Sequence, residues 1–135
     1  MMQFDDTTQR PAIVNLENIF VARDLRHWKE ELSTARVEMV FCYKLFSSII
    51  EGSKVNSATK YHNILEKLAA LKAATLLFED RLQQLALQFE GYAECDDMQC
   101  DQYYMSNHLD FREKIEKHLL EYRQFKQKLL NGIQT

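Results

Sequence analysis

Residues 25–49 read LRHWKEELSTARVEMVFCYKLFSSI. Apolar side chains recur in this segment at steps of three and four residues, which is the heptad pattern of a helix that buries one stripe. The stripe consists of Leu25, Trp28, Leu32, Ala35, Met39, Cys42, Phe46 and Ile49. The pattern predicts one long amphipathic helix, because the apolar residues of a half-buried strand would alternate instead.

Two later segments repeat the pattern. The second stripe is Tyr61, Ile64, Leu68, Leu71, Thr75, Phe78, Leu82, Leu85, Phe89 and Tyr92, and the third is Tyr104, His108, Phe111, Ile115, His118, Tyr122, Phe125 and Leu129. We therefore expect helices over about 15–51, 57–90 and 98–131, with Ser106 as the alternative start of the third helix. Residues 1–14 are expected to form a flexible arm before a single helical domain at 15–135.

Composition supports an all-α fold. The chain of 135 residues contains only three glycines and one proline, too few for the many turns of a β or α/β protein. The short connections between the expected helices make neighbours antiparallel. We predict an elongated up-down-up three-helix bundle with coiled-coil-like heptad stripes. Gly52, Gly91 and Gly132 each follow an expected helix, so we expect left-handed caps with positive φ at all three.

Charge and cysteine content bear on partners and location. The net charge of −3 and the pI of about 5.8 argue against a nucleic-acid-binding face. No apolar run approaches the ~20 residues of a membrane span. Three cysteines, an odd number, favour a reduced, cytoplasmic protein. We expect no nucleic-acid partner, no membrane partner and no cofactor.

A second set of apolar residues lies outside the stripes and predicts an interaction surface. Its members are Val37, Val40, Phe41, Ala73, Leu76 and Leu77. Counting back from a turn near residue 54 places 37–41 level with about 67–71. An apolar patch of this kind on a monomer is typical of a contact surface, although a wide core stripe would also explain it. We predict a homodimer through the first two helices, with the third largely outside.

A metal site is the alternative function. His118 lies on the third stripe, and levelling the helices places it near Glu31 and Glu79, with His27 nearby. Such a Glu/His layer could hold a metal for oxidation or sensing. More often a histidine at this position is hydrogen-bonded and fixes the register of the helices, so we predict no bound metal.

Cys95 and Cys100 stand in an acidic connection before the third helix. A single C-x4-C pair lacks the second ligand pair of a zinc site, so we expect a solvated turn with two thiols and leave a redox role open. No Ser-His-Asp or Cys-His motif is present, which predicts a protein that is not an enzyme.

Two segments carry a resemblance. Residues 27–32 with Glu38 and Phe41, and the run from His108–Leu109 through Tyr122, Phe125, Lys126 and Leu129, resemble the first and last helices of small uncharacterised all-helical bacterial proteins. The layout also looks like a spectrin-type three-helix repeat, with Trp28 in the first helix but no tryptophan in the third. The resemblance implies a fold and no active site. The function expected from the sequence is a non-enzymatic helical bundle that acts by protein–protein interaction.

Overall fold

The computed structural model describes the backbone of residues 4–52 and 58–134, and the side-chain surroundings of residues 19–52, 59–91 and 94–132. Helix α1 spans Phe4–Gly52 and helix α2 spans Ala58–Phe89. A short 3-10 helix, η1, follows at Glu90–Glu94, and helix α3 spans Met98–Gln134. Within the described backbone there is no strand. The all-α, three-helix prediction is confirmed.

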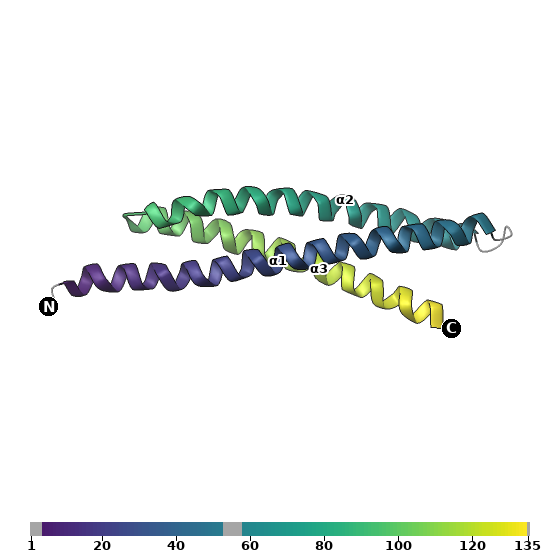
Figure 1. The fold of residues 1–135 in the computed structure, drawn as a ribbon, viewed down its shortest axis with the longest axis horizontal. Helices are drawn as coiled ribbons and strands as arrows, with labels where there is room; N and C mark the ends of the chain where they lie inside the picture. Colours follow the sequence, from purple (N-terminus) through teal and green to yellow (C-terminus); the bar gives the residue numbers. More distant parts are fainter. Residues whose placement is uncertain (1–3, 53–57, 135) are drawn as a thin grey trace.

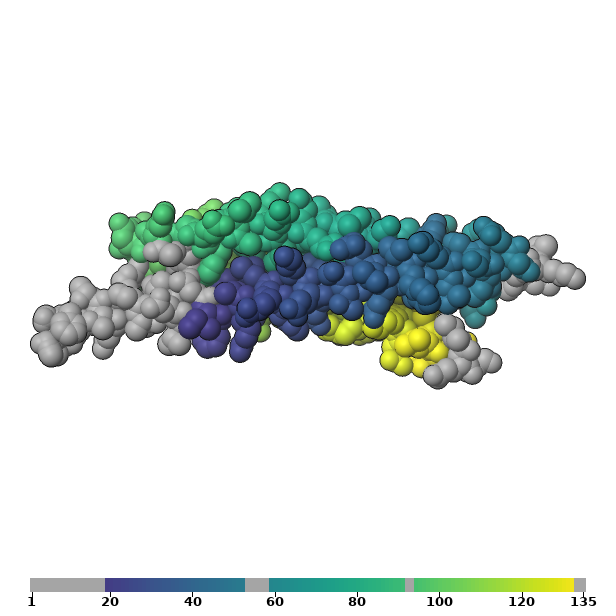
Figure 2. Space-filling model, in the orientation of Figure 1, coloured from purple at the N-terminus to yellow at the C-terminus, as the bar shows by residue number. Residues whose placement is uncertain are grey.

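The three helices run up, down and up as one elongated bundle (Figure 1). Helices α1 and α2 lie side by side along most of their length (Figures 1 and 2), whereas α3 crosses α1 and its C-terminal end diverges from the hairpin (Figure 1). The α1/α2 hairpin is therefore the main structural unit of the bundle. One face of it is left without a third helix.

The core follows the heptad stripes. Each stripe residue with described surroundings is buried or half-buried. The buried residues form two clusters: Trp28, Leu32, Leu82, Leu85, Phe111, Ile115 and Leu119 in the first, and Ala35, Met39, Phe46, Leu68, Leu71 and Tyr122 in the second. Leu32 and Ile115 are fully buried. Burial of these stripes stabilises helices that would be marginal in isolation.

Helix α1 begins earlier than expected. The sequence placed its start near Asn15, after Pro11; a proline inside a helix removes one backbone hydrogen bond and crowds the carbonyl four residues before it. The helix instead starts at Phe4 and runs through Pro11. One missing hydrogen bond does not end a helix that has a long run of bonded turns after it. Residues 4–14 are thus helical rather than the expected arm, and residues 1–3 lie outside the described part.

The glycine prediction is wrong. None of the three glycines, all of which are described, has a positive φ. Gly52 is the last residue of α1, Gly91 lies within η1 and Gly132 lies inside α3. At Gly91 a Cβ atom would approach the Tyr104 hydroxyl to 2.6 Å, so the end of that side chain would have to move to accommodate one.

The start of α3 at Met98 is explained by a side-chain cap. The Asp97 carboxylate accepts a hydrogen bond of 2.8 Å from the Cys100 backbone N–H, as an N-cap residue does. The same turn brings the Cα atoms of Cys95 and Cys100 to 5.5 Å, and the two form a disulfide. The expectation of two free thiols is therefore wrong, because the helix start places the cysteines within bonding range.

Candidate interaction surface

The exposed α1/α2 face is organised by the register of the hairpin. Arg36 Nε lies 2.8 Å from Glu79 Oε1, and Thr75 Oγ1 lies 3.7 Å from Met39 Sδ. Residues 36–39 therefore lie beside 75–79, whereas counting from the turn had placed residues 37–41 beside about 67–71. The apolar stripes of the two helices pack together in this register, with Met39, Leu68 and Leu71 in one buried cluster.

An apolar groove of about 450 Å³ lies along this face. Its lining residues are Met39, Val40, Tyr43 and Lys44 from α1 and Leu68, Ala69, Lys72, Ala73 and Leu76 from α2. Three residues of the predicted surface, Val40, Ala73 and Leu76, meet here. Tyr43 was missed, although it lies one helical turn from Val40, and Ala69 lies one turn from Ala73 on the same apolar side of α2.

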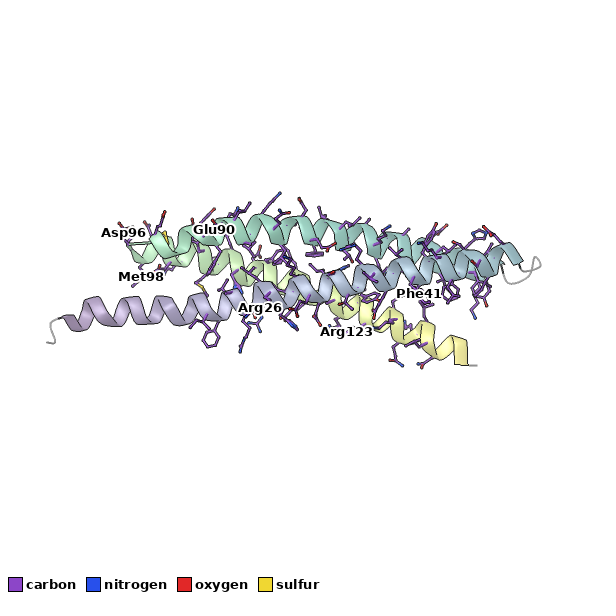
Figure 3. The ribbon with its side chains drawn as sticks, in the orientation of Figure 1. Arg26, Phe41, Glu90, Asp96, Met98 and Arg123 are labelled. Carbon is purple, nitrogen blue, oxygen red and sulfur yellow. A yellow bond between two sulfur atoms is a disulfide. The ribbon has the colours of Figure 1, made fainter. Side chains whose placement is uncertain are left out.

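The other three predicted residues are exposed but do not line this groove. Val37 is 60% exposed, Phe41 66% and Leu77 50%. Successive helical residues point about 100° apart, so Phe41 and Leu77 turn away from the groove that Val40 and Leu76 line. Figure 3 labels Phe41 on α1. The six predicted residues are thus exposed or half-buried, but they do not form one face.

A second groove of about 580 Å³ continues along the same two helices. It is lined by Leu25, Arg26, Lys29, Glu79, Leu82, Gln83 and Ala86. The Arg36–Glu79 ion pair lies between the two grooves along the hairpin. We call the two grooves together the α1/α2 furrow. Its length, from residue 25 to residue 44 of α1, is about 30 Å at the helical rise per residue.

The charges of the furrow differ from those of the chain. Arg26, Lys29, Lys44 and Lys72 line it, and none of the four makes an ion pair with another described residue. The single acidic lining residue, Glu79, is paired with Arg36. A protein with a net charge of −3 therefore presents an apolar furrow with a basic border.

The residues of the alternative metal layer have separate partners. Glu79 pairs with Arg36, while Glu31 lies 3.4 Å from His27 and 3.9 Å from Arg123. His118 contacts neither glutamate in the contacts that the structure gives. Among the described residues no group of three or more histidine, cysteine or acidic side chains is placed to hold a metal.

His118 belongs to a buried polar layer between the two core clusters. Its Nε2 lies 2.8 Å from Thr75 Oγ1, and Thr75 Oγ1 lies 2.8 Å from the Leu71 carbonyl. Because the hydroxyl proton is donated to that carbonyl, the ring N–H donates to the hydroxyl oxygen. The ring also stacks on Phe78 at 4.9 Å. Burial lowers the pKa of His118, partly opposed by Glu121.

His108 forms a second buried polar contact. The ring is 3% exposed, packs against Trp28 at 5.4 Å, and places Nε2 3.0 Å from Asp24 Oδ2. The distance alone suggests a hydrogen bond, yet neither ring nitrogen has a hydrogen-bond partner of acceptable geometry among the described residues. We treat the contact as electrostatic, because misaligned donors bond weakly. Burial lowers the pKa of His108, with Asp24 opposing and Arg112 reinforcing the shift.

A third cluster joins α1 to α3. Glu38 accepts hydrogen bonds from the Tyr122 hydroxyl at 2.5 Å and from Lys126 Nζ at 3.1 Å. Burial by itself raises the pKa of Glu38, but these two donors outweigh it and the net pKa is lowered. Burial and the Glu38 contact together raise the pKa of Tyr122. The cluster therefore links α1 to α3 through charge-assisted hydrogen bonds.

No described helix carries an apolar segment long enough to cross a bilayer. Comparisons of the chain with protein-family models, with curated proteins and with solved structures give no match. The resemblance to small helical bacterial proteins therefore stays a prediction.

Proposed function

We propose that this chain is a non-enzymatic helical-bundle protein that acts by protein–protein contact, with the α1/α2 furrow as its contact surface. It uses no cofactor in this proposal, and its site of action is the cytoplasm. The disulfide weakens one argument for that location, since the three cysteines had been interpreted as reduced.

The observation that carries the proposal is the apolar surface left open along the hairpin. Leu76 is 47% exposed and Tyr43 is 42% exposed, and both line a groove whose floor includes the buried Met39 and Leu68. Covering apolar surface yields about 25 cal/mol for each Å² removed from water. A contiguous apolar groove of this kind is typical of a surface that another helix covers.

A second copy of the chain is the occupant that the sequence predicted. In such a homodimer α1 and α2 of both copies would form a four-helix contact, and α3 would stay outside. The register supports the pairing in one respect: Val40, Ala73 and Leu76 lie at the same level of the hairpin and could meet their own copies.

Sedimentation velocity at micromolar concentration tests the homodimer. The homodimer predicts twice the chain mass of 16.0 kDa, and a folded monomer for Val40→Glu/Leu76→Glu. The control is Leu109→Glu/Leu120→Glu, two exposed leucines of α3, which should leave the dimer intact; because Val40 is half-buried, circular dichroism checks that the Val40→Glu/Leu76→Glu variant stays helical. A monomeric wild type would refute the homodimer, and the furrow would then have to bind a different protein.

A further inference from the structure

The basic side chains along the border of the furrow indicate which kind of partner the furrow fits. Arg26 and Lys29 flank one groove, and Lys44 and Lys72 flank the other. Several described cations outside the furrow have acidic partners, such as Lys67 with Glu121 and Lys126 with Glu38, whereas others, such as Lys117 and Lys128 on α3, have none among the described residues. Four uncompensated cations therefore gather on the one hairpin face that no helix of the chain covers.

We propose, building on the proposed function, that the α1/α2 furrow binds an amphipathic helix of another protein whose flanks are acidic. Apolar residues of the partner helix lie on Val40, Ala73 and Leu76 in one groove and on Leu25, Leu82 and Ala86 in the other. Aspartate or glutamate residues on both edges of that helix meet the four cations. The partner completes a four-helix arrangement over about 20 residues of helix.

Small side chains favour a helix as the occupant. Ala69 and Ala73 line one groove and Ala86 lines the other, so the backbone of a docked helix can come close to α2. A helix laid in a groove binds through residues spaced three and four apart, and the two grooves follow one another along the same helices.

Charge favours a different protein over a second copy. In a face-to-face pairing of two copies, each basic border lies opposite the same basic border or opposite the apolar floor. Like charges brought together across an interface weaken it, whereas opposite potentials strengthen and steer binding. An acidic helix neutralises the four cations without that penalty.

The test uses the full chain and two synthetic helical peptides of about 20 residues, a length that matches the furrow. Both peptides carry leucine and alanine on one face and a fluorescent label. One has glutamate on both flanks, and the other has lysine at the same positions. Fluorescence anisotropy measures binding, at low and at physiological salt.

We expect the glutamate peptide to bind, more weakly at higher salt, and the lysine peptide not to bind. Lys44→Glu/Lys72→Glu should weaken binding of the glutamate peptide by about tenfold or more, because two attractive contacts become repulsive. Lys117→Glu/Lys128→Glu is the matched control: both lysines are exposed, lie on α3 and change the net charge equally. Circular dichroism checks that all variants stay helical.

Three results would overturn the inference: equal binding of both peptides, equal loss in the two lysine variants, or no binding of the glutamate peptide. Failure of the inference and failure of the proposed function are distinguishable. A wild-type dimer that Val40→Glu/Leu76→Glu dissociates, without binding of the glutamate peptide, would refute the acidic helix and keep the furrow as a contact surface. A monomer that binds neither peptide would count against both.

Discussion

The polar layer at Thr75 and His118 yields a prediction that can be worked out from the contacts. Thr75→Val keeps the shape of the side chain but removes the hydroxyl that accepts the His118 N–H at 2.8 Å. Both residues are buried, at 0% and 6% exposure, so the ring nitrogen loses its partner inside the core. A buried donor left without a partner costs about 1–3 kcal/mol, and we expect the free energy of unfolding to fall by that amount.

The double variant distinguishes a coupled pair from two independent sites. His118→Phe keeps a ring that can stack on Phe78, and it removes the need for a partner at Thr75. Thr75→Val/His118→Phe should therefore be close to wild type, because replacing both partners by apolar groups of similar shape is nearly neutral. The two single costs should be non-additive by about 1–2 kcal/mol.

Urea unfolding followed by the fluorescence of Trp28, the single tryptophan of the chain, measures these free energies. Trp28 is 2% exposed, so its emission reports the loss of the core. Thr34→Val, at an exposed position of α1, is the control for the same chemical change outside the core. Additive costs for the two substitutions, or no effect of Thr75→Val, would refute the hydrogen-bonded layer.

Three further predictions concern the other contacts. Burial holds the pKa values of His118 and His108 below 6.5, so below that pH the unfolded chain binds more protons than the folded chain. The free energy of unfolding should therefore be highest above pH 6.5 and fall on acidification by up to about 1.4 kcal/mol per pH unit for each histidine. Urea unfolding at several pH values checks this, and His118→Phe should make the dependence on pH less steep. Gly52→Ala should leave the free energy of unfolding unchanged or raise it by up to about 1 kcal/mol, because φ is not positive at Gly52 and nothing lies within 4 Å of the new Cβ. A lower midpoint of thermal unfolding would instead support a left-handed cap at this residue. Tyr122→Phe should raise the pKa of Glu38 and lower stability by about 1 kcal/mol, since one of its two donors is removed; an unchanged carboxyl titration by NMR would contradict the contact.

The three helices and their buried faces could be predicted from the sequence because they depend only on the three- and four-residue spacing of apolar residues. A stripe such as Leu25, Trp28 and Leu32 is visible directly in the sequence. Few arrangements other than an antiparallel bundle bury three such stripes at once. The helix start at Phe4 was missed because the penalty of Pro11 is local, whereas the helix is long. The disulfide was missed because its formation depends on how the turn before α3 folds.

The contact surface could be predicted only in part, for a geometric reason. Val40, Ala73 and Leu76 were identified by their position off the stripes, and all three line a groove. Phe41 and Leu77 have the same apolar character but turn away from that groove. The basic border depends on the register of α1 against α2. The Arg36–Glu79 ion pair shows that register, whereas the spacing of residues within one helix does not predict it.

Position-specific photo-crosslinking in the native cell tests the central claim, that the α1/α2 furrow is the surface at which this protein meets another chain. A photoreactive amino acid replaces Leu76 in the furrow or, as a control, the exposed Lys117 on α3. Mass spectrometry then identifies the cross-linked segment. The account predicts an adduct from position 76 and none from position 117, with the captured segment carrying an apolar stripe flanked by acidic residues. No adduct from position 76, or the same adducts from both positions, would contradict it.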